Sequence, residues 1–251
     1  MIRNIKLAMS LLLMTLCGCI VSPGLGDGPA QTDSCPYHVY RHDKSGWLLT
    51  NPNITYIFWG SYWQNTGESL YYHDIWTNLY STDIVFDRLA EYGISNPILN
   101  ANYYKVNTDF LNDSTSDVQS SFDDGKIVTE INKDIQEGTI PTPETDTLYV
   151  IFLPPYNVTA NMIKNHWAGY HGSSTYGSGR YAYAVISYQN TDAIDSVVSH
   201  ETYEATTNPD NQGYWDDASL AEIADICDWV PIVIDGISIQ KVWSQETCSC
   251  L

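Results

Sequence analysis

The segment "TPETDTLYVIFLPP" (142–155) is predicted to form a turn followed by a short buried strand. Its apolar run, Leu148 to Leu153, follows polar turn residues and is stopped by two prolines. A short apolar run between such breakers is typical of a strand that is buried on both faces. Two similar runs, "ITYIFWG" (54–60) and "RYAYAVISY" (180–188), predict further strands of the same kind.

Segments with helical periodicity separate these predicted strands. Residues 68–91 carry a broken apolar stripe that ends at Gly93, and residues 121–138 place isoleucines four positions apart before Gly138. Residues 190–207 form a third predicted helix. Strands that alternate with helices predict an α/β or α+β domain, with a central mixed sheet flanked by helices.

Composition and charge exclude two classes of protein. Apolar residues make up 43% of the chain and aromatic residues 13%, which excludes a disordered chain. The formal net charge is −19, from 30 acidic against 11 basic residues. Binding to nucleic acid requires a basic face that neutralises phosphates, so this charge argues against a nucleic-acid partner.

The N-terminus is predicted to be an export signal over residues 1–18. Arg3 and Lys6 precede the apolar run "LAMSLLLMTL" (7–16), which is too short to span a bilayer. The following "LCGC" resembles a bacterial lipobox, in which Cys19 would be lipidated. An ordinary cleaved signal, or a helix that rests on the membrane, is the alternative. A membrane is therefore expected as a partner only through an N-terminal lipid anchor, and the protein is expected in the cell envelope or secreted.

A flexible tether and a single globular domain are predicted to follow the signal. Residues 19–35 are rich in Gly and Pro, which is typical of a linker, and residues 36–251 would form the domain. Four cysteines remain in the exported chain, and they are disulfide candidates: Cys35, Cys227, Cys248 and Cys250. A bridge from Cys227 to Cys248 or Cys250 is preferred. A zinc–thiolate cluster is disfavoured because the chain has no C-x-x-C pair.

The predicted helix at 190–207 contains the pattern H-E-x-x-E within "SVVSHETYEATTNPD" (196–210). On a helical wheel Glu201 falls inside the apolar stripe, while His200 and Glu204 lie on its shoulder. A carboxylate on a buried face costs several kcal/mol unless a cation or a donor compensates it. The position of Glu201 on the buried face therefore predicts that a metal ion binds beside this helix.

The spacing of these residues assigns each a role in a metal site. His200 and Glu204 are one turn apart and can bind the same ion, whereas Glu201 would act as a base on water. Glu222 of "AEIADICDW" is expected as the third ligand. Asp225 is expected one turn later on the same short helix, where it would orient His200 through its free ring nitrogen.

Zinc is the expected ion, because it accepts imidazole and carboxylate ligands in catalytic sites. Calcium is the alternative, since "NPDNQGYWDD" (208–217) offers further oxygen ligands, although it lacks the spacing of an EF-hand. His171, in the Gly- and Ser-rich "HWAGYHGSS", is expected in a loop. There it would hold a substrate oxyanion or a metal, or would serve only as a hydrogen-bonding loop residue.

The ordered motifs of the chain resemble the phosphate-induced protein 1 (EXORDIUM-like) family, in particular its bacterial and fungal branch with an H-E-x-x-E motif. They are "TYIFWGSYW", "DTLYVIFLPPYNVT", "HWAGYHGS", "VVSHETYEATTNPD", "AEIADICDW" and "VWSQETCSC". The resemblance implies a zincin-like metal site in which His200, Glu204 and Glu222 bind the ion and Glu201 is the base. Plant members lack the His-Glu pair, so family membership alone does not imply an enzyme.

Two functions are consistent with these observations. The first is an exported zinc-dependent hydrolase, a metallopeptidase that acts on a peptide or protein substrate with catalytic Glu201 and His171. The second is a non-catalytic surface protein of the cell envelope that binds a glycan or a protein and has a structural or degenerate metal site.

Overall fold

The computed structural model describes the chain over residues 35–42, 46–82, 85–108, 110–111, 120–188, 191–228 and 230–251. Residues 34–251 form one compact unit. The predicted signal (1–18), the lipidation candidate Cys19 and nearly all of the predicted tether lie outside the described residues. No helix within the described ranges is both long and apolar enough to cross a membrane.

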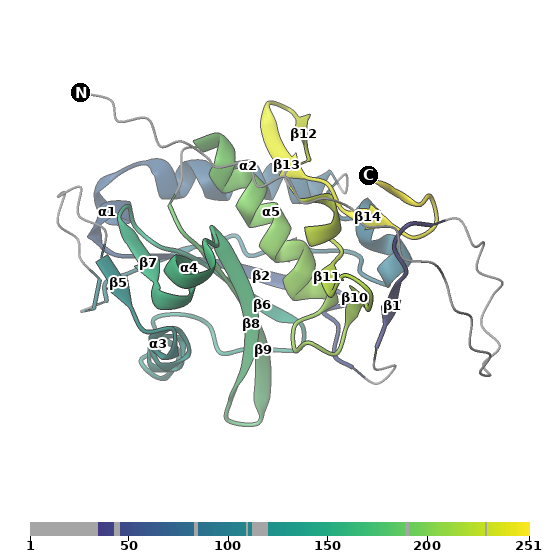
Figure 1. Cartoon of the computed structure of the whole chain (residues 1–251). Helices are drawn as coiled ribbons and strands as arrows, with labels where there is room; N and C mark the ends of the chain where they lie inside the picture. The colour runs from purple at the N-terminus through teal and green to yellow at the C-terminus, as the bar shows by residue number, and fades with distance from the viewer. Residues whose placement is uncertain are drawn as a thin grey trace. The chain divides into compact units, whose positions relative to one another are not determined.

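The core of the unit is a six-stranded mixed sheet in the order β3–β2–β6–β9–β8, with β4 also paired to β2 (Figure 1). Its strands are β2 (Asn53–Trp59), β3 (Ile98–Leu99), β4 (Tyr104–Val106), β6 (Thr147–Phe152), β8 (Gly169–Tyr176) and β9 (Gly179–Ile186). All neighbours pair in parallel except β8, which runs antiparallel to β9 at the sheet edge. The predicted mixed sheet and its three buried strands are confirmed.

Helices cover both faces of this sheet because alternate side chains of its strands point to opposite sides. Tyr56 and Phe58 pack on the face covered by α2 (Glu68–Ser81) and α5 (Thr191–Thr207). Ile57 and Trp59 pack on the other face, which α3 (Gly125–Gln136) and α4 (Ala160–Asn165) cover. Burial on both faces explains why the central strands are continuous apolar runs in the sequence.

Two predicted helices have different bounds in the structure. The segment predicted at 68–91 divides into α2 and a 3₁₀ helix, η1 (Asp87–Tyr92), and Gly93 ends η1 with a φ of 80°. The helix predicted from residue 121 begins only at Gly125, because residues before it form β5 (Ser120–Phe122). That strand pairs in parallel with β7 (Asn157–Thr159), a long-range contact that local periodicity does not reveal.

The remaining elements are short helices and strands. They are α1 (Ser61–Asn65), β1 (Val39–Arg41), β10 (Tyr214–Asp216), β11 (Ala221–Glu222), η2 (Asp225–Cys227), β12 (Pro231–Ile234), β13 (Ile237–Gln240), β14 (Trp243–Ser244) and β15 (Ser249–Cys250). Disulfides join Cys35 to Cys248 and Cys227 to Cys250. The predicted disulfides are thus confirmed, including one of the two preferred partners of Cys227, and they are compatible with an exported protein.

Candidate metal centre

Helix α5 places two carboxylates on its buried face. Its apolar residues Ile194, Val198 and Ala205 are fully buried in the core. Glu201 is only 5% exposed and Glu204 only 3% exposed. The helical-wheel prediction that polar groups of the H-E-x-x-E pattern lie on the buried side is therefore confirmed for both glutamates.

Strand β8 brings His171 against this helix. The prediction that His171 lies in a loop is wrong, because residue 171 pairs with Ala184 of β9 within a regular antiparallel ladder. A Cβ added at Gly169 would come within 2.7 Å of both Glu201 Oε1 and Val197 Cγ1. Gly169 thus reflects the close approach of an edge strand to α5, and not a flexible loop.

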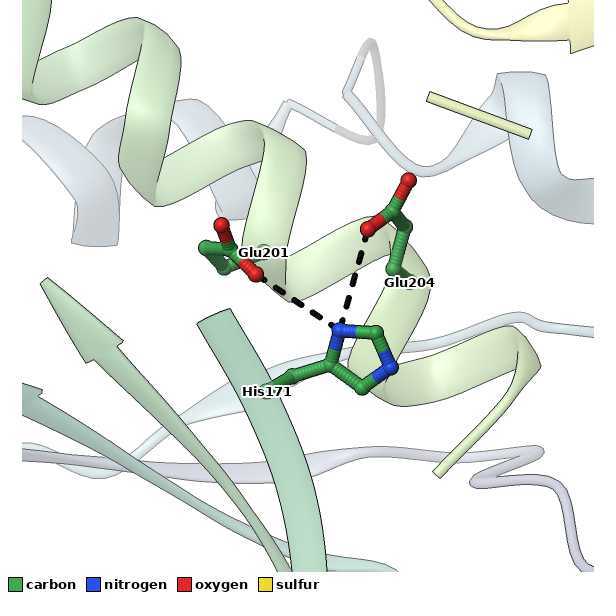
Figure 2. A group of neighbouring side chains, drawn as sticks. All are labelled: His171, Glu201 and Glu204. Atoms are coloured by element: carbon green, nitrogen blue, oxygen red, sulfur yellow. Dashed lines mark ion pairs between the residues drawn. The ribbon is translucent and has the colours of Figure 1, made fainter. Parts of the chain in front are cut away.

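The imidazole of His171 lies between carboxylates on opposite sides. Its Nδ1 is 3.5 Å from Glu201 Oε2 and 3.7 Å from Glu204 Oε2. Figure 2 shows both glutamates extending from α5 toward this nitrogen. The other ring nitrogen, Nε2, is 3.5 Å from Glu222 Oε1. The strand residue therefore connects the helix carboxylates to β11.

The imidazole of His200 faces a second pair of carboxylates through a single nitrogen. Its Nε2 is 3.3 Å from Glu204 Oε2 and 3.5 Å from Asp225 Oδ1. The prediction that Asp225 would contact the other ring nitrogen is wrong. The reason is local: the backbone N–H of Asp225 donates to Glu204 Oε1 at 3.1 Å, which holds Asp225 on the side of His200 that faces Glu204.

The prediction that Glu222 and Asp225 lie on the same short helix is wrong. Glu222 belongs to β11, whose pairing with β10 places it opposite Trp215, and Asp225 begins the short helix η2. Asn208, directly after α5, donates from Nδ2 to Glu222 Oε1 at 2.6 Å. Asn208 also accepts a hydrogen bond from the backbone of Gly213 at 2.7 Å. The sequence pattern placed this asparagine only within a segment of possible calcium ligands (208–217), and its role in holding Glu222 was not predicted.

The carboxylates raise the pKa of both histidines. Burial alone would lower the pKa of His171, but Glu222, Glu201 and Glu204 raise it to about 10. For His200, burial likewise lowers the pKa, and Glu204 and Asp225 outweigh it, so that the pKa lies well above its usual value. Both shifts express the same property of the site, which is an excess of negative charge in a buried place.

The carboxylates respond to burial in different ways. Burial raises the pKa of Glu204 to about 8, although His200 opposes the rise. Burial also raises the pKa of Glu222, against the opposing effect of His171. For Asp225 the hydrogen bond and charge of His200 outweigh burial, and its pKa is lower than usual. Burial therefore disfavours the ionised form of Glu204 unless a positive charge is near.

The separations between donor atoms are compatible with ion pairs and also with ligands that share one zinc ion. In the described part of the chain, only histidines form ion pairs with the four carboxylates. Tetrahedral zinc with bonds of about 2.1 Å separates its ligand atoms by roughly 3.4 Å. The distances from His200 Nε2 to Glu204 and Asp225, 3.3 Å and 3.5 Å, match this separation.

Two groups of potential ligands meet at Glu204. The first is His200, Glu204 and Asp225, and the second is His171, Glu201 and Glu204. Within each group the ligand atoms lie within 4.8 Å of one another. The cluster opens into a cavity of about 270 Å³ that Glu222 and Trp167 also line. Side chains of both groups therefore line one cavity.

The fold and the site define a mixed α/β protein with a buried histidine–carboxylate cluster between a helix and an edge strand. Comparison with known family models, with curated proteins and with solved structures finds no match. The resemblance to the phosphate-induced protein 1 family stays a prediction from the sequence motifs.

Proposed function

We propose that the protein is an exported zinc-dependent hydrolase that cleaves peptide bonds. The observation that carries this proposal is the position of two carboxylate oxygens near His200 Nε2. Their distances from this nitrogen are typical of the separation between two ligand atoms of one zinc ion. The buried position of Glu204 adds to it, because a divalent cation would stabilise the ionised form of a carboxylate that burial disfavours.

His200, Glu204 and Asp225 are the proposed ligands. This set replaces Glu222, the third ligand expected from the sequence, with Asp225, which lies nearer to His200 Nε2. Glu222 instead faces His171 and is held by Asn208. An imidazole among the donors favours zinc over calcium, which prefers six to eight oxygen ligands.

The other residues of the cluster provide proton transfer and charge stabilisation. Zinc in such a site supplies Lewis acidity, which polarises a carbonyl group and promotes attack by water at neutral pH. Glu201 accepts the proton of the attacking water and passes it to the leaving amine. His171, which pairs through Nδ1 with Glu201 and Glu204, would contribute positive charge near the oxyanion of the substrate.

Metal analysis of the purified protein tests this proposal. The wild type is expected to hold one equivalent of zinc after exposure to zinc and removal of the excess, and Glu204→Ala is expected to lose it. Glu201→Gln should keep both fold and zinc while hydrolysis of a mixture of unstructured peptides falls by at least a hundredfold.

The matched control is Glu130→Gln, because Glu130 is also a buried glutamate but lies on α3. It should bind zinc like the wild type. A wild-type protein that holds no zinc would contradict the proposed site. A zinc-loaded wild type that cleaves no peptide would contradict the proposed activity.

A surface feature favours a second candidate function, that of a non-catalytic envelope protein that binds glycans. The rings of Tyr40 and His42 stack at 4.6 Å, and those of His42 and Trp215 stack at 3.8 Å. Tyr40 is 43% exposed, and flat aromatic surfaces of this kind bind sugar rings. In this case the ion would be structural, and Tyr40→Ala, but not Glu201→Gln, would reduce binding to polysaccharides.

A further inference from the structure

A second cavity, of about 310 Å³, lies at the start of the parallel strands β2 and β6. Asn53 and Thr55 of β2 line it, and so do Thr147 and Tyr149, which pair with them on β6. Tyr149 belongs to the apolar cluster on the α3 side of the sheet, so this cavity lies on the face opposite to α5. It shares no residue with the cavity of the metal centre. We call it the amide pocket, because three of its lining residues are asparagines.

The amide pocket is polar but nearly uncharged. None of its lining residues, all of them in the described ranges, is a lysine or an arginine, and Glu144 is its single acidic residue. An anionic ligand would therefore find no cation there, and the formal charge of −19 on the whole chain disfavours it further. An apolar ligand is also a poor match, because Ala101 and Pro141 are the only aliphatic residues of the lining. The pocket is thus suited to a neutral polar ligand.

The buried amides of the pocket have hydrogen-bonding capacity that the protein does not use. Asn53 Oδ1 is buried and has no hydrogen-bond partner among the described residues. Because no bond holds this oxygen, rotation of the carboxamide lets either its oxygen or its nitrogen face a ligand. Asn100 donates from Nδ2 to Thr55 Oγ1, which leaves its own oxygen as an acceptor. A buried polar atom without a partner costs free energy, and hydrogen bonds from a ligand would offset this cost.

Aromatic and exposed polar residues complete the lining. The hydroxyl of Tyr149 donates to the backbone oxygen of Pro141 at 2.6 Å, which fixes the ring, and the half-buried Tyr104 adds a second ring. The exposed residues Asn102 and Glu144 contribute a further amide and a carboxylate acceptor. A sugar ring matches this combination, because its hydroxyl groups both donate and accept hydrogen bonds while its C–H face packs on aromatic rings.

We propose that the amide pocket binds a neutral sugar residue of a glycan. Asn53 and Asn102 exchange hydrogen bonds with its hydroxyl groups, and Glu144 accepts hydrogen bonds from them. Tyr104 packs against the C–H face of the sugar ring. Neutral sugars are preferred to sulfated sugars and uronic acids, because Glu144 repels an anion and no cation of the pocket compensates it.

This site is separate from the features on which the proposed function and its alternative rest. It lies on the sheet face opposite to α5, so a bound glycan does not occupy the metal centre. None of the three stacked rings, those of Tyr40, His42 and Trp215, lines the amide pocket. An exported hydrolase with such a pocket would be held on a glycan-bearing surface while its metal centre stays free for substrate.

Binding to immobilised oligosaccharides tests the proposal. The probe is an array of neutral oligosaccharides, each beside a counterpart that carries sulfate or uronic acid, and the bound protein is detected through an affinity tag. We expect at least one neutral oligosaccharide to bind about tenfold more tightly than its acidic counterpart, and EDTA to leave this binding unchanged. Binding to none of them, equal binding of neutral and acidic counterparts, or loss of binding in EDTA would overturn the proposal.

Variants determine whether the amide pocket is the binding site. Asn102→Ala and Glu144→Gln should each weaken binding to that oligosaccharide about fivefold, and both change exposed residues, so the fold should be kept. Asn78→Ala is the matched control, because Asn78 is an exposed asparagine of α2 that does not line the pocket. Tyr40→Ala should also leave the binding unchanged. Equal effects of Asn102→Ala and Asn78→Ala, or loss of binding in Tyr40→Ala alone, would overturn the proposal.

Discussion

Glu204 is the residue on which the candidate metal centre depends. Its Oε2 faces the imidazoles of both His171 and His200, and its Oε1 accepts the backbone hydrogen bond of Asp225. One buried carboxylate thus contacts the edge strand, the neighbouring turn of α5 and the start of η2. Loss of this side chain would remove a proposed ligand and also the hydrogen bond that holds Asp225.

Gly169 determines how closely β8 approaches α5. In Gly169→Ala the new methyl group meets Glu201 Oε1 and Val197 Cγ1 at 2.7 Å, so the helix side chains or the strand must move. Such overpacking costs about 1–3 kcal/mol. We expect the free energy of unfolding, measured with urea, to fall by this amount, and zinc affinity to change because Glu201 and His171 are displaced.

Gly67→Ala is the control for this substitution. Gly67 precedes α2 with a φ of −81°, and a Cβ at that position has no atom within 4 Å. Its free energy of unfolding should therefore stay within about 1 kcal/mol of the wild type. Equal stability of the two alanine variants would show that β8 and α5 are not packed as closely as described.

Helix α3 carries a buried carboxylate, that of Asp134, on the face of the sheet opposite to α5. Asp134 is 2% exposed, and burial, reinforced by the charge of Glu130, raises its pKa to about 7. The folded protein therefore retains a proton that the unfolded chain releases above about pH 4. This contribution to stability is complete below that pH and is lost as the pH rises toward 7.

Asp134→Asn should remove this pH dependence. Relative to the wild type, the variant should gain stability as the pH rises from 4 to 7, by about 2–4 kcal/mol over the whole range. Urea denaturation at each pH measures the difference, and Asp74→Asn on α2 controls for the loss of one charge. A difference that stays constant from pH 4 to 7 would contradict the buried, protonated state of Asp134.

Elements with a strong local pattern could be predicted, and elements that depend on distant partners could not. Helix α5 and the strands β2, β6 and β9 follow directly from the spacing of their apolar residues. His171 of strand β8 was predicted to lie in a loop because the glycines of the strand are explained only by distant partners, α5 for Gly169 and Tyr183 for Gly172. Strand β11 is two residues long and exists through its pairing with β10, so the sequence around Glu222 carries no strand signal.

At the scale of the whole molecule, the site assembles from four segments that are far apart in the chain. The edge strand β8 provides His171, α5 provides His200 and both glutamates, and β11 and η2 provide Glu222 and Asp225. The composition of the cluster could be predicted from the sequence, because H-E-x-x-E and the later acidic pair are visible there. The division of the carboxylates between the two histidines could not, since it depends on the orientation of β11 and η2.

The disulfide between Cys227 and Cys250 links the segment that contains Asp225 to the C-terminus. Cys227 ends the short helix that Asp225 begins, so the bridge attaches the ligand-bearing segment to the final strand, β15. Cys35 and Cys248 attach the start of the described chain to the same region. The two bridges therefore restrict the segment whose carboxylates complete the candidate metal centre.

Diffraction at the zinc absorption edge, from crystals of the protein grown with zinc, tests the central claim most directly. We expect one anomalous peak about 2.0–2.2 Å from His200 Nε2 and from carboxylate oxygens of Glu204 and Asp225. A peak bonded to Glu222 in place of Asp225 would correct the ligand set. Absence of a peak between His200 and Glu204 would contradict the claim that this cluster is a metal centre.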